Sequence, residues 1–355
     1  EPLGIEVVLL VGKQSKKERD LAVRKTADGT AKIAIGTHAL IQEGVSFGHL
    51  GFVVVDEQHR FGVLQRAALR DKGLGNPDVL VMTATPIPRT LTMTLYGDLD
   101  VSVIDELPPG RKPVKTHWKK PFERSGVYDA VQKLLHEGRQ AYVVCPMISE
   151  NEKVSAQAAE DLHDRLQTGA LREWKVGLLH GQMKAKEKEE KMLQFRAREI
   201  DVLVSTTVIE VGVDVPNASV MVVEDANRFG LSQLHQLRGR VGRGEYQSYC
   251  ILIADARTDD AIARMEIMRE TNDGFKIAEE DLRLRGPGEL VGTKQSGNLD
   301  LKIADLVRDA KQLERAREAA IQLIAEDSEL ASPDHAGMLE KVRQRREKAA
   351  LITVS

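Results

Sequence analysis

Two adjacent carboxylates, Asp56 and Glu57, directly follow a run of apolar, mostly β-branched residues at 51–55. Such a run is typical of an interior strand in a parallel sheet, and open α/β sheets bind ligands beyond the carboxyl ends of their strands. One acid in this position can hold Mg²⁺ while the other orients a water molecule for phosphoryl transfer. The alternative is an ordinary strand end followed by a helix cap, since Asp is common at caps.

Hydroxyl side chains follow the next predicted strand along the chain. Thr83 and Thr85 lie in the sequence Thr-Ala-Thr-Pro, so we expect them beside Asp56 and Glu57 at the same edge of the sheet. A coupling role is one interpretation. The other is an ordinary turn with a helix N-cap, because Pro86 suits the first helical turn.

Two further turns could contact phosphates. Ser205-Thr206-Thr207 follows a strand predicted at 201–204 and leads to Gly212 and Asp214. Hydroxyls and free backbone amides at such a turn suit phosphate oxygens. Thr37, in a Gly-Thr-His-Ala sequence at another strand end, is a weaker candidate for the same contact.

Alternating arginines and glycines form the most specific motif of the chain. We call residues 236–244, Gln-Leu-Arg-Gly-Arg-Val-Gly-Arg-Gly, the arginine–glycine box. Arginines in this pattern rarely serve a core, because a buried guanidinium without partners is costly, whereas a planar fork matches phosphate. We expect Arg240 and Arg243 to reach a γ-phosphate across a domain cleft, a role worth about 10³–10⁵ in rate in other nucleotide hydrolases. A general basic loop for nucleic acid is the alternative.

Composition describes a globular chain of two or three domains. Of its 355 residues 42% are hydrophobic and 30% are charged, and the net charge of −3 argues neither for nor against a nucleic-acid partner. No apolar stretch approaches the roughly 18 residues of a membrane span. Cys145 and Cys250 lie in or beside apolar strand patterns, where we expect them to pack as small hydrophobes in a reducing cytosol.

Short apolar runs alternate with helix-period segments, which predicts βαβ units and parallel sheets. A stretch with three prolines at 107–113 interrupts this rhythm and indicates a linker, and beyond about residue 256 the sequence turns helical. Predicted strands are 5–11, 32–35, 52–55, 79–82 and 101–104, then 140–145, 175–179, 201–204, 220–223 and 248–253; predicted helices include 16–24, 63–70, 127–136 and 158–166.

These motifs resemble those of the superfamily 2 helicases and translocases, and most closely the RecG family of bacterial branched-DNA translocases. The resemblance rests on Asp-Glu-Gln-His-Arg-Phe-Gly-Val at 56–63, Thr-Ala-Thr-Pro-Ile-Pro-Arg-Thr at 83–90, Glu-Leu-Pro-Pro-Gly-Arg at 106–111, the box, and a helical segment at 264–297. It implies an α/β fold of two tandem RecA-like domains: a partial first motor domain (1–107), a linker (108–113), a second motor domain (114–256), a translocation hairpin and loop (257–300) and a helical tail (301–355).

The resemblance also implies roles for individual residues. Asp56 would hold Mg²⁺ and Glu57 would polarise water, while Arg240 and Arg243 would reach the γ-phosphate of ATP. The remaining implied roles are nucleotide contacts by Gly212, Asp214 and Gln236, DNA contacts by Thr37, Thr206 and Thr207, and coupling by His59, Thr83, Thr85, Arg264, Arg285 and Gln295.

One motif of the family is missing from this sequence. No Gly-x-x-x-x-Gly-Lys-Ser/Thr occurs, and the superficially similar Gly12-Lys13-Gln14-Ser15 carries Gln14 at the hydroxyl position. In the family the phosphate loop and the wedge domain precede the part that corresponds to this chain. We therefore expect a piece of a longer protein, with an incomplete first motor domain and negligible ATP hydrolysis on its own.

The expected function is an ATP-dependent and Mg²⁺-dependent translocase acting on double-stranded, forked and four-way DNA in repair and recombination. The resemblance further implies a monomer in the cytoplasm, without membrane contact. A transcription-repair coupling translocase is the near alternative, although it would carry a second acid at Gln58. A non-catalytic remnant that binds DNA is the alternative from another functional class.

Overall fold

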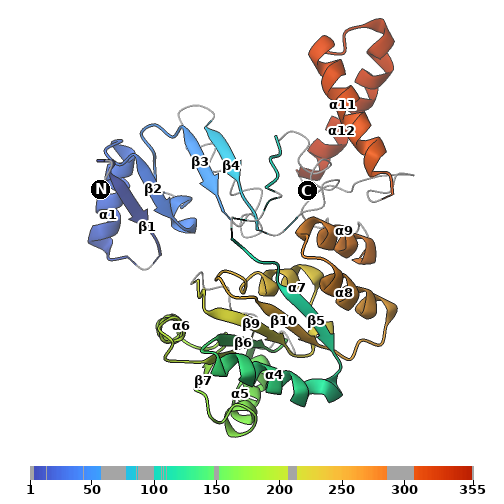
Figure 1. The fold of residues 1–355 in the computed structure, drawn as a ribbon. Helices are drawn as coiled ribbons and strands as arrows, with labels where there is room; N and C mark the ends of the chain where they lie inside the picture. The colour runs from blue at the N-terminus through green and yellow to red at the C-terminus, as the bar shows by residue number, and fades with distance from the viewer. Residues whose placement is uncertain are drawn as a thin grey trace. The chain divides into compact units, whose positions relative to one another are not determined.

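The computed structural model describes residues 4–12, 14–42, 44–56, 77–84, 86, 100–104, 106, 108, 110–147, 152–206, 214–285 and 308–353. They belong to two compact units, Glu1–Thr85 and Pro86–Ser355 (Figure 1). The predicted helix at 63–70 lies outside the described residues.

The first unit contains two pairs of parallel strands. β1 (Val7–Leu10) pairs with β2 (Ile33–Gly36), and β3 (Phe52–Val55) pairs with β4 (Asp78–Val81). Helix α1 (Lys16–Ala27) packs on the first pair and begins with a capping box, in which the Ser15 hydroxyl accepts from the Glu18 amide while the Glu18 carboxylate accepts from the Ser15 amide. The 3₁₀ helix η1 (His38–Leu40) follows β2.

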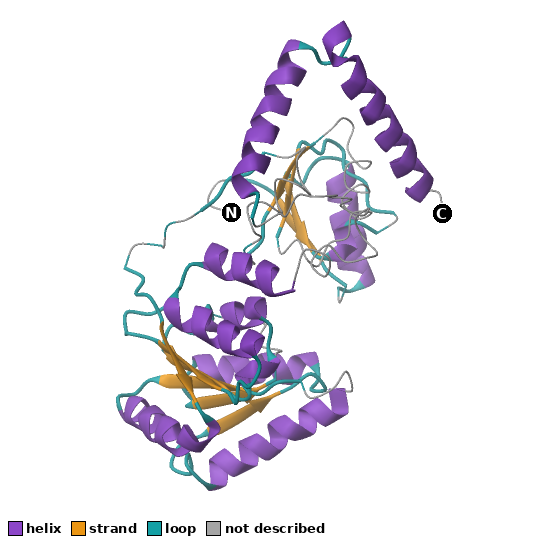
Figure 2. Cartoon of the chain, turned by 90° about the vertical axis from the view of Figure 1, so that its right-hand side faces the viewer, coloured by secondary structure: helices purple, strands orange, loops and turns teal. Residues whose placement is uncertain are grey.

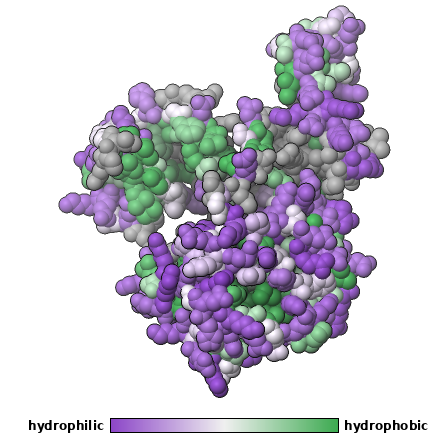
Figure 3. All heavy atoms as spheres, viewed as in Figure 1, coloured by the Kyte–Doolittle hydropathy of each residue, from purple (hydrophilic) through white to green (hydrophobic). Residues whose placement is uncertain are grey.

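Each strand pair of the first unit buries one face and leaves apolar side chains exposed on the other. Figure 3 shows apolar atoms in green at the surface of this unit. The exposed side chains are Val7, Leu9, Ile33 and Ile35 on β1–β2, and Phe52, Val54, Leu80 and Met82 on or beside β3–β4. Period-2 alternation therefore holds in both pairs, with Val8 and Leu10, or Val53 and Val55, facing inward.

The second unit is built on one parallel sheet of six strands. They are β5 (Lys115–Lys119), β6 (Gln140–Val144), β7 (Val176–Leu179), β8 (Val202–Ser205), β9 (Ala218–Val223) and β10 (Tyr249–Ile253). Their order in the sheet is β5-β10-β9-β6-β8-β7. Along the chain, the connection from β8 to β9 crosses from one side of β6 to the other, which makes the carboxyl end of β6 the switch point where such sheets bind ligands.

Helices cover both faces of this sheet (Figure 2). Side chains of α4 (Arg124–His136) and α5 (Glu152–Thr168) share one core with Ala141 and Val143, whereas α6 (Ala185–Arg196), α7 (Leu231–Arg238) and α8 (Asp259–Glu270) share the other core with Tyr142 and Val144. Because both faces are buried, the strands are apolar throughout. Helix α9 (Gly274–Arg285) packs against α7 and α8.

The observed strands differ from the predicted ones in two places among the described residues: one predicted strand does not form, and one observed strand was not predicted. The predicted strands other than 101–104 all overlap observed ones, and helices at 16–24, 127–136 and 158–166 are confirmed. Residues 101–104 form no strand, and Ile104 is 90% exposed, because alternating apolar residues become a strand only beside a partner strand. Strand β5 was not predicted; it lies at the sheet edge, where Lys115, His117 and Lys119 interrupt the apolar pattern.

A buried acid ties the carboxyl end of β9 to helix α4. The Glu224 carboxylate accepts hydrogen bonds from Arg124 Nε at 3.0 Å and from the Tyr128 hydroxyl at 2.8 Å. The bond to Glu224 raises the pKa of Arg124, and burial raises the pKa of Tyr128. This contact is structural, since every partner of Glu224 named here belongs to the sheet or its covering helix.

Both cysteines are buried and free, as predicted. Burial raises the pKa of Cys145 to about 11 and that of Cys250 to about 12, so neither thiol is a nucleophile near neutral pH. Among the described helices, none is both long enough and apolar enough to cross a membrane.

Asp327 closes the turn between two C-terminal helices, α11 (Ala310–Glu326) and α12 (Ala336–Thr353), which are joined through the 3₁₀ helix η5 (Pro333–His335). Its carboxylate accepts from His335 Nδ1 at 2.7 Å and from the amides of Ser332 and Ala331. The bond to His335, followed by the two amide bonds, lowers the pKa of Asp327 to about 2.

We expect this turn to be pH-dependent. A carboxyl whose pKa is depressed on folding stabilises the fold above its ordinary pKa, and the contribution is lost as pH falls from about 4 towards 2. The protection of the Ala331 and Ser332 amides, measured as hydrogen exchange relative to the intrinsic rate at each pH, should therefore fall over that range, and D327N should show low protection at every pH. The control is E329Q, which alters an exposed neighbour. Equal protection in D327N and the unchanged protein at neutral pH would refute this role.

Candidate functional site

The acidic pair and the Thr-Ala-Thr turn start at the same edge of the β3–β4 pair. The strands are parallel with Val55 opposite Val81, and the Met82 amide donates to the Val55 carbonyl at 2.7 Å. Asp56 is the first residue beyond β3, Thr83 is the second beyond β4, and both are exposed. Both residues therefore lie at this carboxyl edge, as the sequence predicted. Glu57, His59 and Thr85 lie outside the described residues.

An exposed carboxylate at a strand end suits Mg²⁺, which binds through one or two carboxylates and otherwise keeps water or phosphate oxygens as ligands. Asp56 can supply one such oxygen ligand. The described residues contain no cluster of three or more metal-ligating side chains.

The turn between β1 and α1 is held by a glutamine side chain. The Val11 amide donates to Gln14 Oε1 at 3.0 Å, and Gln14 Nε2 donates to the Leu9 carbonyl at 2.8 Å. Both polar side-chain atoms of Gln14 are therefore hydrogen-bonded to the backbone of its own turn. This accounts for a glutamine where a phosphate-binding loop carries a hydroxyl.

Thr37 lies just past β2 and is exposed. The preceding Gly36 is required by packing, because a Cβ there would collide with the Leu10 carbonyl oxygen on the neighbouring strand. The glycine thus has a structural reason within the strand pair. The Thr37 amide donates to the Leu10 carbonyl at 3.2 Å, so the exposed side-chain hydroxyl is the group that a phosphate could reach.

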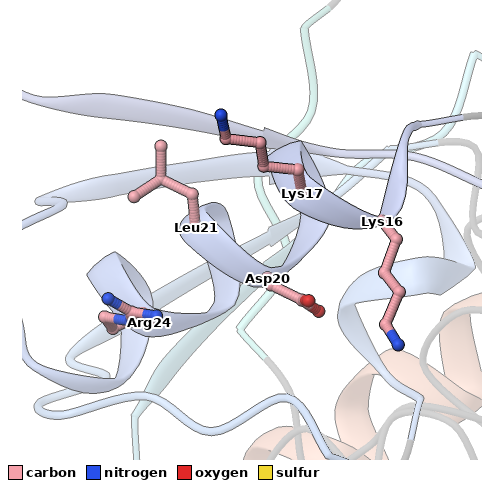
Figure 4. A pocket seen from close by; sticks show the side chains of 5 residues that line it. All are labelled: Lys16, Lys17, Asp20, Leu21 and Arg24. Atoms are coloured by element: carbon pink, nitrogen blue, oxygen red, sulfur yellow. The ribbon is translucent and has the colours of Figure 1, made fainter.

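A shallow hollow near this turn is lined by Lys16, Lys17, Asp20, Leu21 and Arg24 (Figure 4). All five side chains come from α1, so the hollow is the open side of one helix. We assign it no function.

Thr206 follows β8 and is only 2% exposed, and its hydroxyl is buried without a hydrogen-bond partner among the described residues. The hydroxyl is therefore covered in this structure, and the contact of Thr206 with DNA stays a prediction. The prediction rested on a hydroxyl side chain at the end of a strand, and neighbouring strands can bury a side chain in that position. Thr207 and Gly212 lie outside the described residues.

The loop of the arginine–glycine box approaches the segment after Asp214. A Cβ at Gly244 would collide with the Pro216 carbonyl oxygen, so the glycine permits this approach. Arg243 Nη1 lies 3.5 Å from Asp214 Oδ1, and Arg243 Nε donates to the Gly239 carbonyl. The structure thus brings together Arg243 and Asp214, two residues that the sequence assigned separately to one nucleotide site.

The conformation of the loop depends on Gly242 and on the linker. Gly242 has φ +80°, which favours glycine, and its carbonyl accepts from Arg111 Nε at 3.0 Å. Arg111 belongs to the proline-rich segment predicted as a linker. The sequence offered no sign of this contact, since the two residues are 131 positions apart.

Arg240 is half-buried and Gln236 is exposed on α7. The charges of Arg240, Arg243 and Asp214 all act on the buried hydroxyl of Tyr142, whose pKa burial raises to about 12. Arg240, Arg243 and Asp214 therefore all lie near this hydroxyl. Two cations and one carboxylate that lie near one another can receive a polyphosphate and a hydroxyl group.

Arg238 departs from the expectation that arginines of the box avoid the core. It is 3% exposed, and Nη1 donates to the Met268 carbonyl at 3.0 Å and to the Thr271 carbonyl at 2.7 Å. Nη2 lies 3.2 Å from His235 Nδ1. These bonds satisfy the guanidinium, which removes the cost of burial on which the expectation rested.

Arg264 and Arg285 converge on the start of α7. Arg264 Nη1 donates to the Phe229 carbonyl at 2.8 Å, and the Arg285 guanidinium packs against Gly230, where any Cβ would collide with it. Asp281 pairs with Arg285 at 2.9 Å; burial raises the pKa of Asp281, and the charges of Arg285 and Arg264 oppose that rise. Gln295 lies outside the described residues.

Three family models match the chain. The DEAD/DEAH box helicase model covers residues 1–94, the helicase conserved C-terminal domain covers residues 126–245, and the C-terminal model of domain 3 of ATP-dependent DNA helicase RecG covers residues 271–353. The second of these models includes the box, and the third includes α9 but not α8.

Relatives and solved structures give the same result. The ATP-dependent DNA helicase RecG of Bacillus subtilis is 52% identical over 336 residues, 95% of this chain and 49% of the relative, and that of Synechocystis is 52% identical over 98% of this chain and 41% of the relative. The chain thus spans about half the length of the curated relatives it matches.

A structure of RecG bound to a three-way DNA junction is 45% identical, with a TM-score of 0.66 over 88% of this chain and 40% of that chain. The DUF1998 helicase MrfA bound to DNA and AMPPNP is 16% identical, with a TM-score of 0.54 over 88% of this chain and 47% of that chain, which shows the shared RecA-like α/β fold alone. By sequence and by structure, the chain belongs to the family of the ATP-dependent DNA helicase RecG.

Proposed function

We propose that the protein to which this chain belongs is an ATP-dependent translocase that moves along double-stranded DNA and remodels branched DNA such as forks and four-way junctions. The observation that carries the proposal is the contact of Arg243 with Asp214 beside the box, on a chain of this family. A family member bound to a three-way DNA junction supports the substrate class.

The hydrolytic residues are assigned as follows. Asp56 holds Mg²⁺, which neutralises charge on the phosphates during transfer, and Glu57 orients the attacking water. Arg240 and Arg243 stabilise the charge that develops on the γ-phosphate, while Gly212, Asp214 and Gln236 bind the nucleotide. In this assignment ATP displaces the Asp214 carboxylate as the partner of Arg243.

DNA contacts and coupling are assigned to other residues. Thr37, Thr206 and Thr207 contact the DNA backbone in this assignment, and the contact of Thr206, which is buried in this structure, requires its side chain to become exposed. The coupling residues are His59, Thr83, Thr85, Arg264, Arg285 and Gln295. Binding of this kind is mainly to phosphates, so affinity should fall steeply with salt and vary little with sequence. The protein is expected to act as a monomer in the cytoplasm.

DNA-stimulated ATP hydrolysis by the complete gene product tests this function. A motor hydrolyses ATP faster when forked DNA is added, whereas a non-catalytic DNA-binding protein binds the fork without turnover. Fork binding without hydrolysis would refute the proposal.

The 355-residue chain alone should hydrolyse ATP negligibly even with DNA and Mg²⁺ present. Its sequence has no phosphate loop, and Gln14 occupies the nearest substitute turn with backbone hydrogen bonds. Without backbone amides and a lysine around the β- and γ-phosphates, the transition state lacks its main support. A phosphate-release assay measures the rate, with the complete gene product as control. Turnover of the 355-residue chain near ~1 s⁻¹, an ordinary enzymatic rate, would contradict this expectation.

A further inference from the structure

Helix α7 is held at both ends by the α8–α9 pair. At its start, Arg264 of α8 donates to the Phe229 carbonyl, and Arg285 of α9 packs on Gly230. At its end, Arg238 of α7 donates to the Met268 and Thr271 carbonyls where α8 terminates. The chain continues from this end of α7 directly into Gly239 and the catalytic arginines of the box.

The contact at the end of α7 differs from the other two in burial. Arg238 is 3% exposed, and within the described part of the chain no carboxylate pairs with it. Its charge is instead met by the carboxyl end of α8, where unpaired carbonyls carry the negative end of the helix dipole. Pulling α7 away from α8 would leave a buried cation and two carbonyls without partners, so the two helices must move together.

The neighbouring histidine fixes the guanidinium from the other side. Burial, followed by the charge of Arg238, lowers the pKa of His235 to about 4, so its ring is neutral near pH 7. Because a guanidinium only donates, Nδ1 of this ring accepts and the proton lies on Nε2. Arg238 Nη1 also lies 3.5 Å from the Thr116 hydroxyl on β5.

We propose that Arg238 is a positioning residue that transmits displacement of the box to the α8–α9 pair, and that it takes no part in hydrolysis itself. The proposal rests on the motor function proposed above and adds a residue of the box that binds the end of α8, whereas Arg243 lies beside Asp214. Arg240 and Arg243 then sense the phosphate, while Arg238, two positions earlier, carries the movement. Three arginines of one motif thereby couple contact with the phosphate to movement of the α8–α9 pair.

The test uses the complete gene product and the variants R238M and R238K. Two quantities are measured on forked DNA: the rate of ATP hydrolysis and the base pairs remodelled per ATP hydrolysed. R238M should keep DNA-stimulated hydrolysis within about threefold while base pairs per ATP fall about tenfold, the factor that ~1.4 kcal/mol of lost coupling produces. The base pairs remodelled per ATP by R238K should lie between those of R238M and of the unchanged protein, since an ammonium keeps the charge without the planar fork.

R139M is the matched control. Arg139 is also largely buried and donates to a carbonyl, that of Gln247 at 3.1 Å, but within the described residues it forms no hydrogen bond with α8 or α9. The R139M variant should be less stable than the unchanged protein but should remodel the same number of base pairs per ATP hydrolysed.

The outcomes separate this proposal from the function on which it rests. If the unchanged protein does not hydrolyse ATP with DNA, the proposed function fails and this inference fails with it. If the unchanged protein works, but hydrolysis and remodelling fall in proportion in R238M, or neither falls, only the inference is overturned. Should R238M not fold, R238K decides in the same way, and an unchanged ratio overturns the inference.

Discussion

Replacing Arg240 by alanine in the complete gene product should lower DNA-stimulated ATP hydrolysis about 10³-fold or more, the effect of removing an arginine finger from a nucleotide hydrolase. Arg240 lies near the Tyr142 hydroxyl, as Arg243 and Asp214 do, and Arg238 is the arginine of the box that donates hydrogen bonds to the end of α8. Removing Arg240 should therefore leave the fold and DNA affinity unchanged. Phosphate release under saturating ATP measures the effect.

The control for this experiment is R172A. Arg172 is exposed just before β7, at the opposite edge of the same sheet, so its loss should leave hydrolysis unchanged. A fall of less than tenfold in R240A, or an equal fall in R172A, would show that the box does not act on the γ-phosphate. Loss of DNA binding in R240A would instead favour the general basic loop.

The second large effect is expected at Asp56. D56N keeps the size of the side chain but removes the charge that holds Mg²⁺, and a bound divalent cation contributes several kcal/mol to phosphoryl transfer. Hydrolysis should fall about 10²-fold or more at fixed Mg²⁺, since each ~1.4 kcal/mol is a factor of ten. The Mg²⁺ concentration for half-maximal rate should also rise, which a structural role would not cause.

D78N is the matched control for D56N. Asp78 begins β4, so it lies at the amino edge of the same strand pair, while Asp56 follows the carboxyl end of β3. Its loss should change neither the rate nor the Mg²⁺ dependence. A D56N protein with unaltered Mg²⁺ dependence would place the metal elsewhere.

The sequence was most informative where burial dictates residue type. Strands β6, β8 and β9 are buried on both faces, and a continuous apolar run is the pattern that such burial requires. The placement of Asp56 and Thr83 followed from one rule, that parallel neighbours end at the same edge. Helix α6, which is rich in lysine and glutamate, is mostly exposed.

Features that depend on distant partners could not be read from sequence. Edge strand β5 has a single neighbour and a polar alternation, so no apolar run marks it. Residues 101–104 have such a run but form no strand among the described residues. Arg238 looks like its neighbours in the box, and only the carbonyls at the end of α8, 30 or more positions away, distinguish it.

Simultaneous measurement of fork remodelling and ATP hydrolysis tests the central claim most directly. The complete gene product is mixed with a fluorescent fork, and base pairs exchanged and phosphate released are recorded in one reaction. The motor account predicts that both begin on adding ATP, rise together with protein concentration, and stop when a non-hydrolysable ATP analogue is used. Fork binding with neither exchange nor phosphate release, or exchange that continues with the analogue, would contradict it.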